Sequence, residues 1–337
     1  MRKLLYLWIN GPLSVRLSQN QIDKISEILE YYFKDSVPKE FSRKPRSLKY
    51  LSYFKATELR QLLLYIGPVV FQKILNKNVY TNFLTLHVAV SILNNPLLCK
   101  SPEWINYAEK LMEKFVKDFK IIYGPQYMSH NIHNCLHISN DVRTYNCVEN
   151  FSAFRFENTI FKIKKLLHNK GYKVLEQVHS HILEAESIDL DIINSANNSD
   201  NLITKKQHFS GPLGDRKFIG VNEIKQFKAI EFSDFYIDCN ASKDNKVLIN
   251  KKAVEIVNIV SRTSDNELFI VGREMTYVKD LYTLPCSSST LNIKVVEKSN
   301  GAFQIWPFKM ISAKLFTLPF KEKIAVFPIL HSVKKHN

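Results

Sequence analysis

The spacing of apolar residues changes once along this chain of 337 residues. Through residue 186, apolar side chains recur every three or four positions, which is typical of amphipathic helices. Residues 187–214 contain the polar run NSANNSDN and the turn-prone SGPLG, so we predict a linker there. From residue 215 to residue 337, β-branched residues alternate with polar ones in short runs such as KVLIN and ELFIVG, which are typical of strands. The chain is therefore predicted to be α+β, with an all-α region followed by a small all-β domain, barrel-like or a sandwich.

Two helices have recognisable starts. Ser18 and Gln21 have the spacing of a capping box, ahead of an apolar series that stops at Val37-Pro38. Ser101 precedes Pro102, a residue tolerated in the first turn of a helix, and the pattern continues to about Lys120. We therefore predict helices after Ser18 and after Ser101.

The charge of the chain favours a polyanionic partner. Its 47 Lys and Arg residues exceed its 32 Asp and Glu residues, giving a formal net charge of +15. Basic side chains gain affinity for nucleic acid by releasing condensed counterions, so DNA is the predicted partner. The five cysteines form no C-x-x-C pair, which speaks against a secreted disulfide scaffold and predicts free thiols.

The two longest apolar runs are too short for a membrane role. The opening MRKLLYLWINGPL imitates a signal peptide, but its apolar run is short and no small-residue cleavage site follows, so we expect a buried helix. The run LLLYIGPVVF at 62–71 is interrupted by Gly67-Pro68 and is far shorter than the ~20 residues of a spanning helix.

Two basic clusters are candidate DNA contacts. The first lies in a segment rich in aromatic residues and comprises Arg43, Lys44, Arg46 and Lys49. The second lies on a predicted helix and comprises Lys162, Lys164 and Lys165. The alternatives are a solvated loop, which Pro45 favours, and a solvated helix face.

One carboxylate and one group of histidines suggest metal chemistry. Glu157 heads an amphipathic helix at the margin of its apolar stripe, but two-metal catalysis needs several converging oxygens. His130, His133 and His137 would align on one helix, with Cys135 close in sequence. They lack the ligand spacing of a structural zinc site, so we expect these histidines to make polar contacts inside the helical region.

Several long segments resemble the DDE transposases of the CACTA (En/Spm-like) type. The resemblance runs through LLYLWINGPLSVRLS, FSRKPRSL, FKATELRQLLLYIGPVVF and NFLTLHVAVSILNNPLLC, at 4–18, 41–48, 54–71 and 82–99. It continues from Tyr107 to Tyr145 and into FSAFRFEN at 151–158, so it covers about the first half of the chain.

The resemblance implies a role for Glu157. In that family a ribonuclease H-like domain holds metal ions with two early aspartates and a late glutamate on a helix, and Glu157 matches this glutamate. The aspartates and an Asp-x-x-His motif lie before the position that Met1 matches. The resemblance therefore implies a C-terminal part without the core sheet, consisting of a helical insertion (1–125) and the glutamate-bearing helices (126–186).

The resemblance also bears on function. It implies a transposon-derived, nuclear DNA-binding protein that is catalytically incomplete as given, with no cofactor of its own and with Mg²⁺ implied for a complete family member. The alternatives are a cytoplasmic location and a non-enzymatic protein-interaction or chromatin-associated module that acts through the β domain. Nothing in the sequence fixes the oligomeric state.

Overall fold

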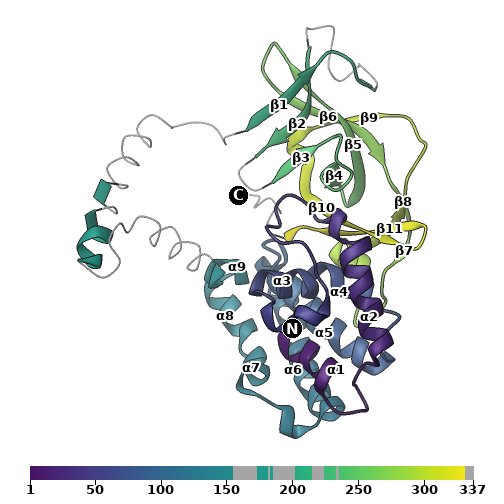
Figure 1. Cartoon of the computed structure of the whole chain (residues 1–337). Coiled ribbons are helices and arrows are strands. Elements are labelled where there is room, and N and C mark those ends of the chain that lie inside the picture. The colour runs from purple at the N-terminus through teal and green to yellow at the C-terminus, as the bar shows by residue number, and fades with distance from the viewer. Residues whose placement is uncertain (155–172, 181–182, 185–201, 215–223, 233–234, 331–337) are drawn as a thin grey trace.

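The protein consists of a helical part followed by a β part. The computed structural model describes residues 1–154, 173–180, 183–184, 202–214, 224–232 and 235–330. In Figure 1 the helices of the first part lie below the strands of the last part. The predicted α+β class and the order of the two regions are confirmed.

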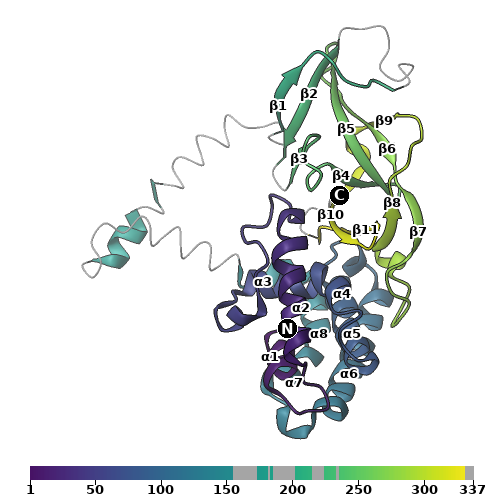
Figure 2. The same cartoon turned by 45° about the vertical axis from the view of Figure 1, so that its right-hand side comes forward.

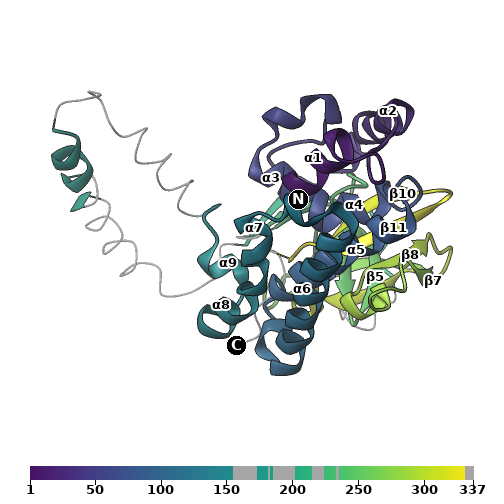
Figure 3. The ribbon, with the colours of Figure 1, turned by 90° about the horizontal axis from the view of Figure 1, so that it is seen from below.

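The helical part contains one long antiparallel pair and several shorter helices. The helices are α1 (Arg2–Asn10), α2 (Gln19–Glu27), α3 (Ala56–Gln61), α4 (Gly67–Val70), α5 (Lys77–Leu93), α6 (Pro102–Tyr123), α7 (His130–His133), α8 (Ile138–Tyr145) and α9 (Val148–Phe151). Single turns η1 (Ile28–Tyr32), η3 (Leu48–Tyr53) and η4 (Leu62–Ile66) extend or join them. Seen from below, α5 and α6 lie side by side (Figure 3).

The predicted helix starts are confirmed. The Ser18 hydroxyl accepts from the backbone N–H of Gln21, and the Gln21 side chain accepts from the backbone N–H of Ser18 at 2.9 Å. The Ser101 hydroxyl caps α6, which runs to Tyr123 with Pro102 in its first turn. The opening segment is the expected buried helix, with Leu4, Leu5, Leu7 and Trp8 in the core. No described helix is long and apolar enough to cross a membrane.

The helical backbone continues through Gly67 and Pro68, the pair that interrupts the apolar run at 62–71. A π turn, η4, stands between α3 and α4, and such a wider turn accommodates the missing N–H of a proline. A Cβ atom on Gly67 would lie 2.5 Å from both the Leu62 carbonyl oxygen and the Phe83 ring. The glycine therefore lets α4 approach α5 closely.

The β part forms one antiparallel sheet. Its strands are β1 (Ile203–His208), β2 (Ile224–Glu231), β3 (Tyr236–Asp238), β4 (Lys246–Ile249), β5 (Lys252–Arg262), β6 (Leu268–Glu274), β7 (Thr276–Asp280), β8 (Lys294–Glu297), β9 (Gln304–Pro307), β10 (Ile311–Phe320) and β11 (Lys323–Pro328). The main order is β1-β2-β5-β4-β10-β11-β8-β7, while β3 pairs with β2, and β6 pairs with β5 and β9.

The sheet is not closed, which corrects the barrel-like expectation. The end strands β1 and β7 do not pair with each other in the described part of the sheet. Instead, β10 pairs with β4 along its first half and with β11 along its second half. Apolar side chains near that second half pack against helices, so burial there comes from the helical region and not from closure.

The segment predicted as a linker contains a strand. β1 lies inside 187–214 and pairs with β2, with Ile203 opposite Glu231 and Gln207 opposite Phe227. Its sequence, ITKKQH, is too polar to show an apolar alternation, which is why it was taken for a linker. The β part therefore begins near Ile203, and the other predicted boundaries, at 125 and 186, stay predictions.

The two parts share one hydrophobic core. Figures 1 and 2 show β10 and β11 as the strands nearest the helices. Phe41 and Tyr65 from the helical part meet Phe316 of β10 and Phe327 of β11, with ring centroids 5.2–6.4 Å apart. We call these four residues the aromatic junction. Since apolar area removed from water stabilises a fold roughly in proportion to that area, the helices and the sheet stabilise each other.

A buried histidine also links the two parts. The carbonyl oxygen of Leu63 accepts from Nδ1 of His87 at 2.8 Å, so Nε2 is the unprotonated nitrogen of the neutral ring and accepts from the Tyr282 hydroxyl at 3.0 Å. Burial lowers the pKa of His87 from its ordinary 6.5 to about 4. The neutral imidazole is therefore the form that fits the folded protein.

This histidine makes the fold sensitive to acid. Because the unfolded chain binds a proton near pH 6.5 and the folded chain only near pH 4, stability is full above pH 6.5 and falls as the pH drops towards 4. At pH 4.5 the loss from this group is roughly 2–3 kcal/mol. Urea unfolding at pH 7.5 and at pH 4.5 measures this loss of stability. His87→Gln does not titrate and should lose less stability between the two pH values by that amount, whereas equal losses would contradict this role.

Candidate functional site

Most basic side chains of the predicted segment 43–49 form ion pairs with carboxylates of the helical part. Arg46 donates to both oxygens of Glu58, at 2.7 and 2.9 Å, and its guanidinium lies 5.4 Å from the Phe54 ring centroid. Although burial acts to raise the pKa of Glu58, the hydrogen bonds from Arg46 and from the backbone of Lys55 hold it below its ordinary value. Arg46 is therefore a structural partner of a buried carboxylate, joining the loop to α3.

The other three residues of the segment differ in their partners. Lys44 pairs with Asp35 at 3.3 Å and Lys49 pairs with Asp23 at 3.4 Å. Arg43 is exposed, and no carboxylate of the described residues lies within ion-pair distance of it. The segment thus presents less free positive charge than its sequence suggests.

The other predicted site residues give no metal centre in the described structure. Glu157, Lys162, Lys164 and Lys165 lie outside the described residues. The helix that would align the histidines is interrupted at Asn134, and the rings of His133 and His137 lie 5.3 Å apart. In the described ranges, no three His, Cys, Asp or Glu side chains gather as metal ligands would.

A different basic surface lies at the β7 edge of the sheet. We call Lys251, Lys279, Lys294 and Lys321, together with Tyr277 and Phe320, the lysine surface. Lys294 lies 5.9 Å from the Tyr277 ring centroid and donates to the backbone carbonyl of Lys251 at 2.6 Å. Lys279 lies 5.8 Å from the Phe320 ring centroid. These contacts join β7, β8 and two hairpin turns into one surface.

The lysines of this surface form no ion pair with the described carboxylates. No described carboxylate lies within 4.0 Å of any of the four ammonium groups, whereas the adjacent Lys252 and Lys323 pair with Glu274 and Glu297. Burial lowers the pKa of Lys294, against the opposing effect of Asp280. A phosphate beside this lysine would favour its charged form.

A groove runs beside Lys279. Its volume is about 340 Å³, and it is lined by Val278, Lys279, Phe320, Lys321, Glu322 and Lys323. An aromatic wall among several lysines provides both a stacking surface and charge, the two features that single-stranded and distorted nucleic acids use. Tyr277, which is 51% exposed, lies on the same strand as Lys279.

Sequence reasoning missed the lysine surface because its members are far apart in the chain. The four lysines are at least 15 positions from one another and come from separate elements. Lys251 and Lys321 sit at positive φ, 62° and 56°, in the β4–β5 and β10–β11 hairpin turns. Only the pairing of β7, β8 and β11 brings these turns to the same edge.

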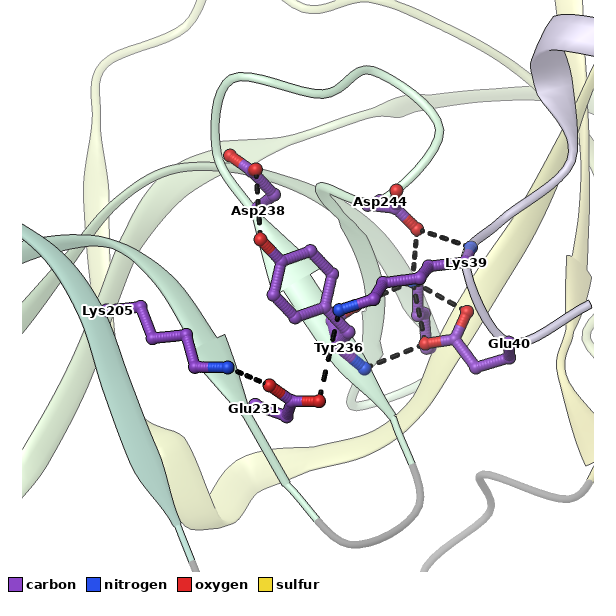
Figure 4. Close-up of polar contacts among 8 residues, drawn as sticks. Lys39, Glu40, Lys205, Glu231, Tyr236, Asp238 and Asp244 are labelled. Atoms are coloured by element: carbon purple, nitrogen blue, oxygen red, sulfur yellow. Dashed lines mark hydrogen bonds and ion pairs between the residues drawn. The ribbon is translucent and has the colours of Figure 1, made fainter.

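The densest buried charge cluster lies between the helices and the sheet (Figure 4). Lys314 of β10 is fully buried and donates to both oxygens of Glu40, at 2.9 and 2.8 Å, and to Asp244 at 2.5 Å. Glu40 also accepts from the backbone N–H of Tyr236 at 2.7 Å. Asp244 accepts from the backbone N–H of Lys39 at 3.1 Å. We call Lys314, Glu40 and Asp244 the buried charge triad.

The surrounding residues shield the triad. Lys39 lies 3.9 Å from the Tyr236 ring centroid and 3.9 Å from Glu231, which also pairs with Lys205 (Figure 4). The Tyr236 hydroxyl donates to Asp238 at 3.1 Å. Because both carboxylates of the triad are occupied by hydrogen bonds, we assign the triad a structural role.

Comparison with known proteins adds one match. Over residues 207–329 the chain is similar to a family described as a domain of unknown function (DUF8592). No curated protein and no solved structure matches the chain. The matched residues include the lysine surface and the sheet side of the buried charge triad.

Removing the lysine of the triad should destabilise the protein strongly. Lys314→Met leaves two buried carboxylates without their cation, for which we expect a loss of about 3–5 kcal/mol in unfolding free energy. Lys44→Met, which breaks an exposed pair, should cost at most about 1 kcal/mol. Chemical denaturation compares the two variants. Similar small losses would show that the triad does not hold the junction.

Proposed function

We propose that this chain is related to the CACTA-type DDE transposases and binds duplex DNA with little sequence preference. The relationship is supported by the ordered motifs between Leu4 and Asn158, which are long and occur in the order of that family. DNA binding is supported by the net charge of +15 and by the free lysines of the β part. Phosphate contacts alone supply most of the affinity of non-specific binding.

The lysine surface is the single observation that carries the DNA-binding proposal. Four ammonium groups without a carboxylate partner among the described residues, beside two aromatic rings, match the contacts expected of a phosphate-binding face. The segment at 43–49 contributes less in this proposal, since only Arg43 lacks a carboxylate partner among the described residues. DNA would therefore be bound chiefly through the β part.

We propose binding without cleavage for this chain. The resembling family needs three carboxylates to hold its metal ions, and Glu157 is the one residue here that matches any of them. Mg²⁺ belongs to the complete family member in this proposal, as the metal that positions phosphoryl oxygens. A nuclear location follows from the proposed partner.

A protein partner bound by the β part is the second candidate function. The end strand β1 pairs with β2 on one side only in the described structure, and Phe209, which directly follows it, is 90% exposed. An exposed strand edge next to an apolar side chain is a surface to which a peptide strand can be added. DNA binding that persists when β1 is blocked would separate the two functions.

Charge removal on the lysine surface should weaken DNA binding. In Lys279→Gln with Lys321→Gln, each lost phosphate contact should reduce the slope of log affinity against log salt by roughly 0.9. The matched control is Lys44→Gln with Lys49→Gln, which removes equal charge from lysines already paired with acids. Fluorescence anisotropy with a labelled duplex at several salt concentrations measures both.

The outcome shows separately whether the protein binds DNA and which of its surfaces does so. We expect a clear loss for the Lys279 and Lys321 variant and a smaller one for the control. A larger loss for the control would move the interface to the helical part. If the unchanged protein showed no binding at low salt, the DNA-binding function itself would be wrong.

A further inference from the structure

A small cavity opens beside the aromatic junction. Its volume is about 110 Å³, below the range of about 300–1,000 Å³ typical of sites for drug-sized ligands. The polar side chains that line it are Glu40, Ser42, Arg43, Thr57, Arg60 and Gln61. They come from the loop before η3 and from α3, two segments that are held together by the Arg46–Glu58 pair.

Gln61 is a buried polar group in need of a partner. Gln61 lines the cavity and is 2% exposed, yet its amide nitrogen makes no hydrogen bond with the described residues. Leaving a buried donor without a partner costs about 1–3 kcal/mol, and such groups in native proteins usually meet water, an ion or a ligand. The wall of the cavity therefore holds a buried donor that has no partner among the described residues.

Two arginines add positive charge to the same cavity. Arg43 has no carboxylate within ion-pair distance among the described residues. Arg60 donates through one nitrogen to Glu149 at 2.7 Å, and its guanidinium lies 5.4 Å from the Phe154 ring centroid. A guanidinium carries five N–H donors, and Glu149 is the one acceptor of Arg60 among the described residues.

The one carboxylate that lines the cavity is already neutralised. Both oxygens of Glu40 accept from Lys314, and one of them also accepts from the backbone N–H of Tyr236. Its charge is thus paired within the buried charge triad. The other lining residues carry no negative charge.

We infer that this cavity binds a phosphate group. Two arginines, a glutamine and two hydroxyl-bearing residues, Ser42 and Thr57, line a space suited to a small anion and too small for a nucleoside. A phosphate, with several acceptor oxygens, can accept from more of these lining donors than a carboxylate, which has only two oxygens. The phosphate is either a free ion or a phosphodiester of a nucleic-acid backbone.

Titration calorimetry with inorganic phosphate on the full chain tests the site. The ionic strength is kept constant by exchanging chloride for phosphate. Arg43→Gln should raise the Kd for phosphate about tenfold, since hydrogen bonds to charged groups are among the stronger ones. Lys44→Gln, one residue away and outside the cavity, should leave it within about twofold. Gln61→Met should also weaken phosphate binding without lowering the Tm of the phosphate-free protein.

The results divide clearly. Phosphate binding that fails to exceed that of chloride, or that falls equally in the Arg43 and Lys44 variants, overturns the inference. A phosphate response that disappears in saturating duplex DNA supports the site and identifies the backbone as the source of the phosphate. A response that persists in DNA supports the site for free phosphate. Because the phosphate arm needs no DNA, loss of the proposed DNA-binding function would leave this inference standing.

Discussion

The burial of one lysine between two carboxylates determines how the halves of this protein meet. Lys314 comes from β10, Glu40 from the helical part and Asp244 from the loop before β4, so each segment supplies a charge that is unstable in the interior without the others. Apolar packing tolerates small shifts between surfaces, but a triad of this kind requires one arrangement of donors and acceptors. The aromatic junction beside it supplies the buried apolar area, and the triad fixes how the helical part and the β part are placed against each other.

β10 connects this placement to the rest of the β part. The same strand carries Lys314 in its middle and Phe316 two residues later, and it ends at Phe320, on the lysine surface. Its pairing with both β4 and β11 fixes where the hairpin turns lie relative to the helices. Phe320 at the end of β10 belongs to the lysine surface, and Lys314 in its middle binds Glu40, which lines the small cavity, so one strand and the buried charge triad position both.

Local signals in the sequence predicted local structure well. The capping pairs at Ser18 and Ser101 and the alternating runs after residue 215 correspond to α2, α6 and most of the strands, because these features depend on neighbours in the chain. β1 was missed because its polar residues show no apolar alternation. The candidate sites were predicted less well: Arg46 is held by Glu58, twelve positions away, and the four lysines of the lysine surface come from two strands and two hairpin turns. Such pairings depend on the fold, and no local pattern records them.

The open sheet has a consequence for the state of the protein in solution. β7 ends the strand order, and an end strand offers unpaired backbone groups to which another copy of the chain can add its own strand. Lys279 lies on this strand and Lys294 on its neighbour, and repulsion between such charges opposes stacking of two copies edge to edge. The positive charge at this edge thus also opposes self-association. Because salt screens charge repulsion, this effect should weaken as the salt concentration rises.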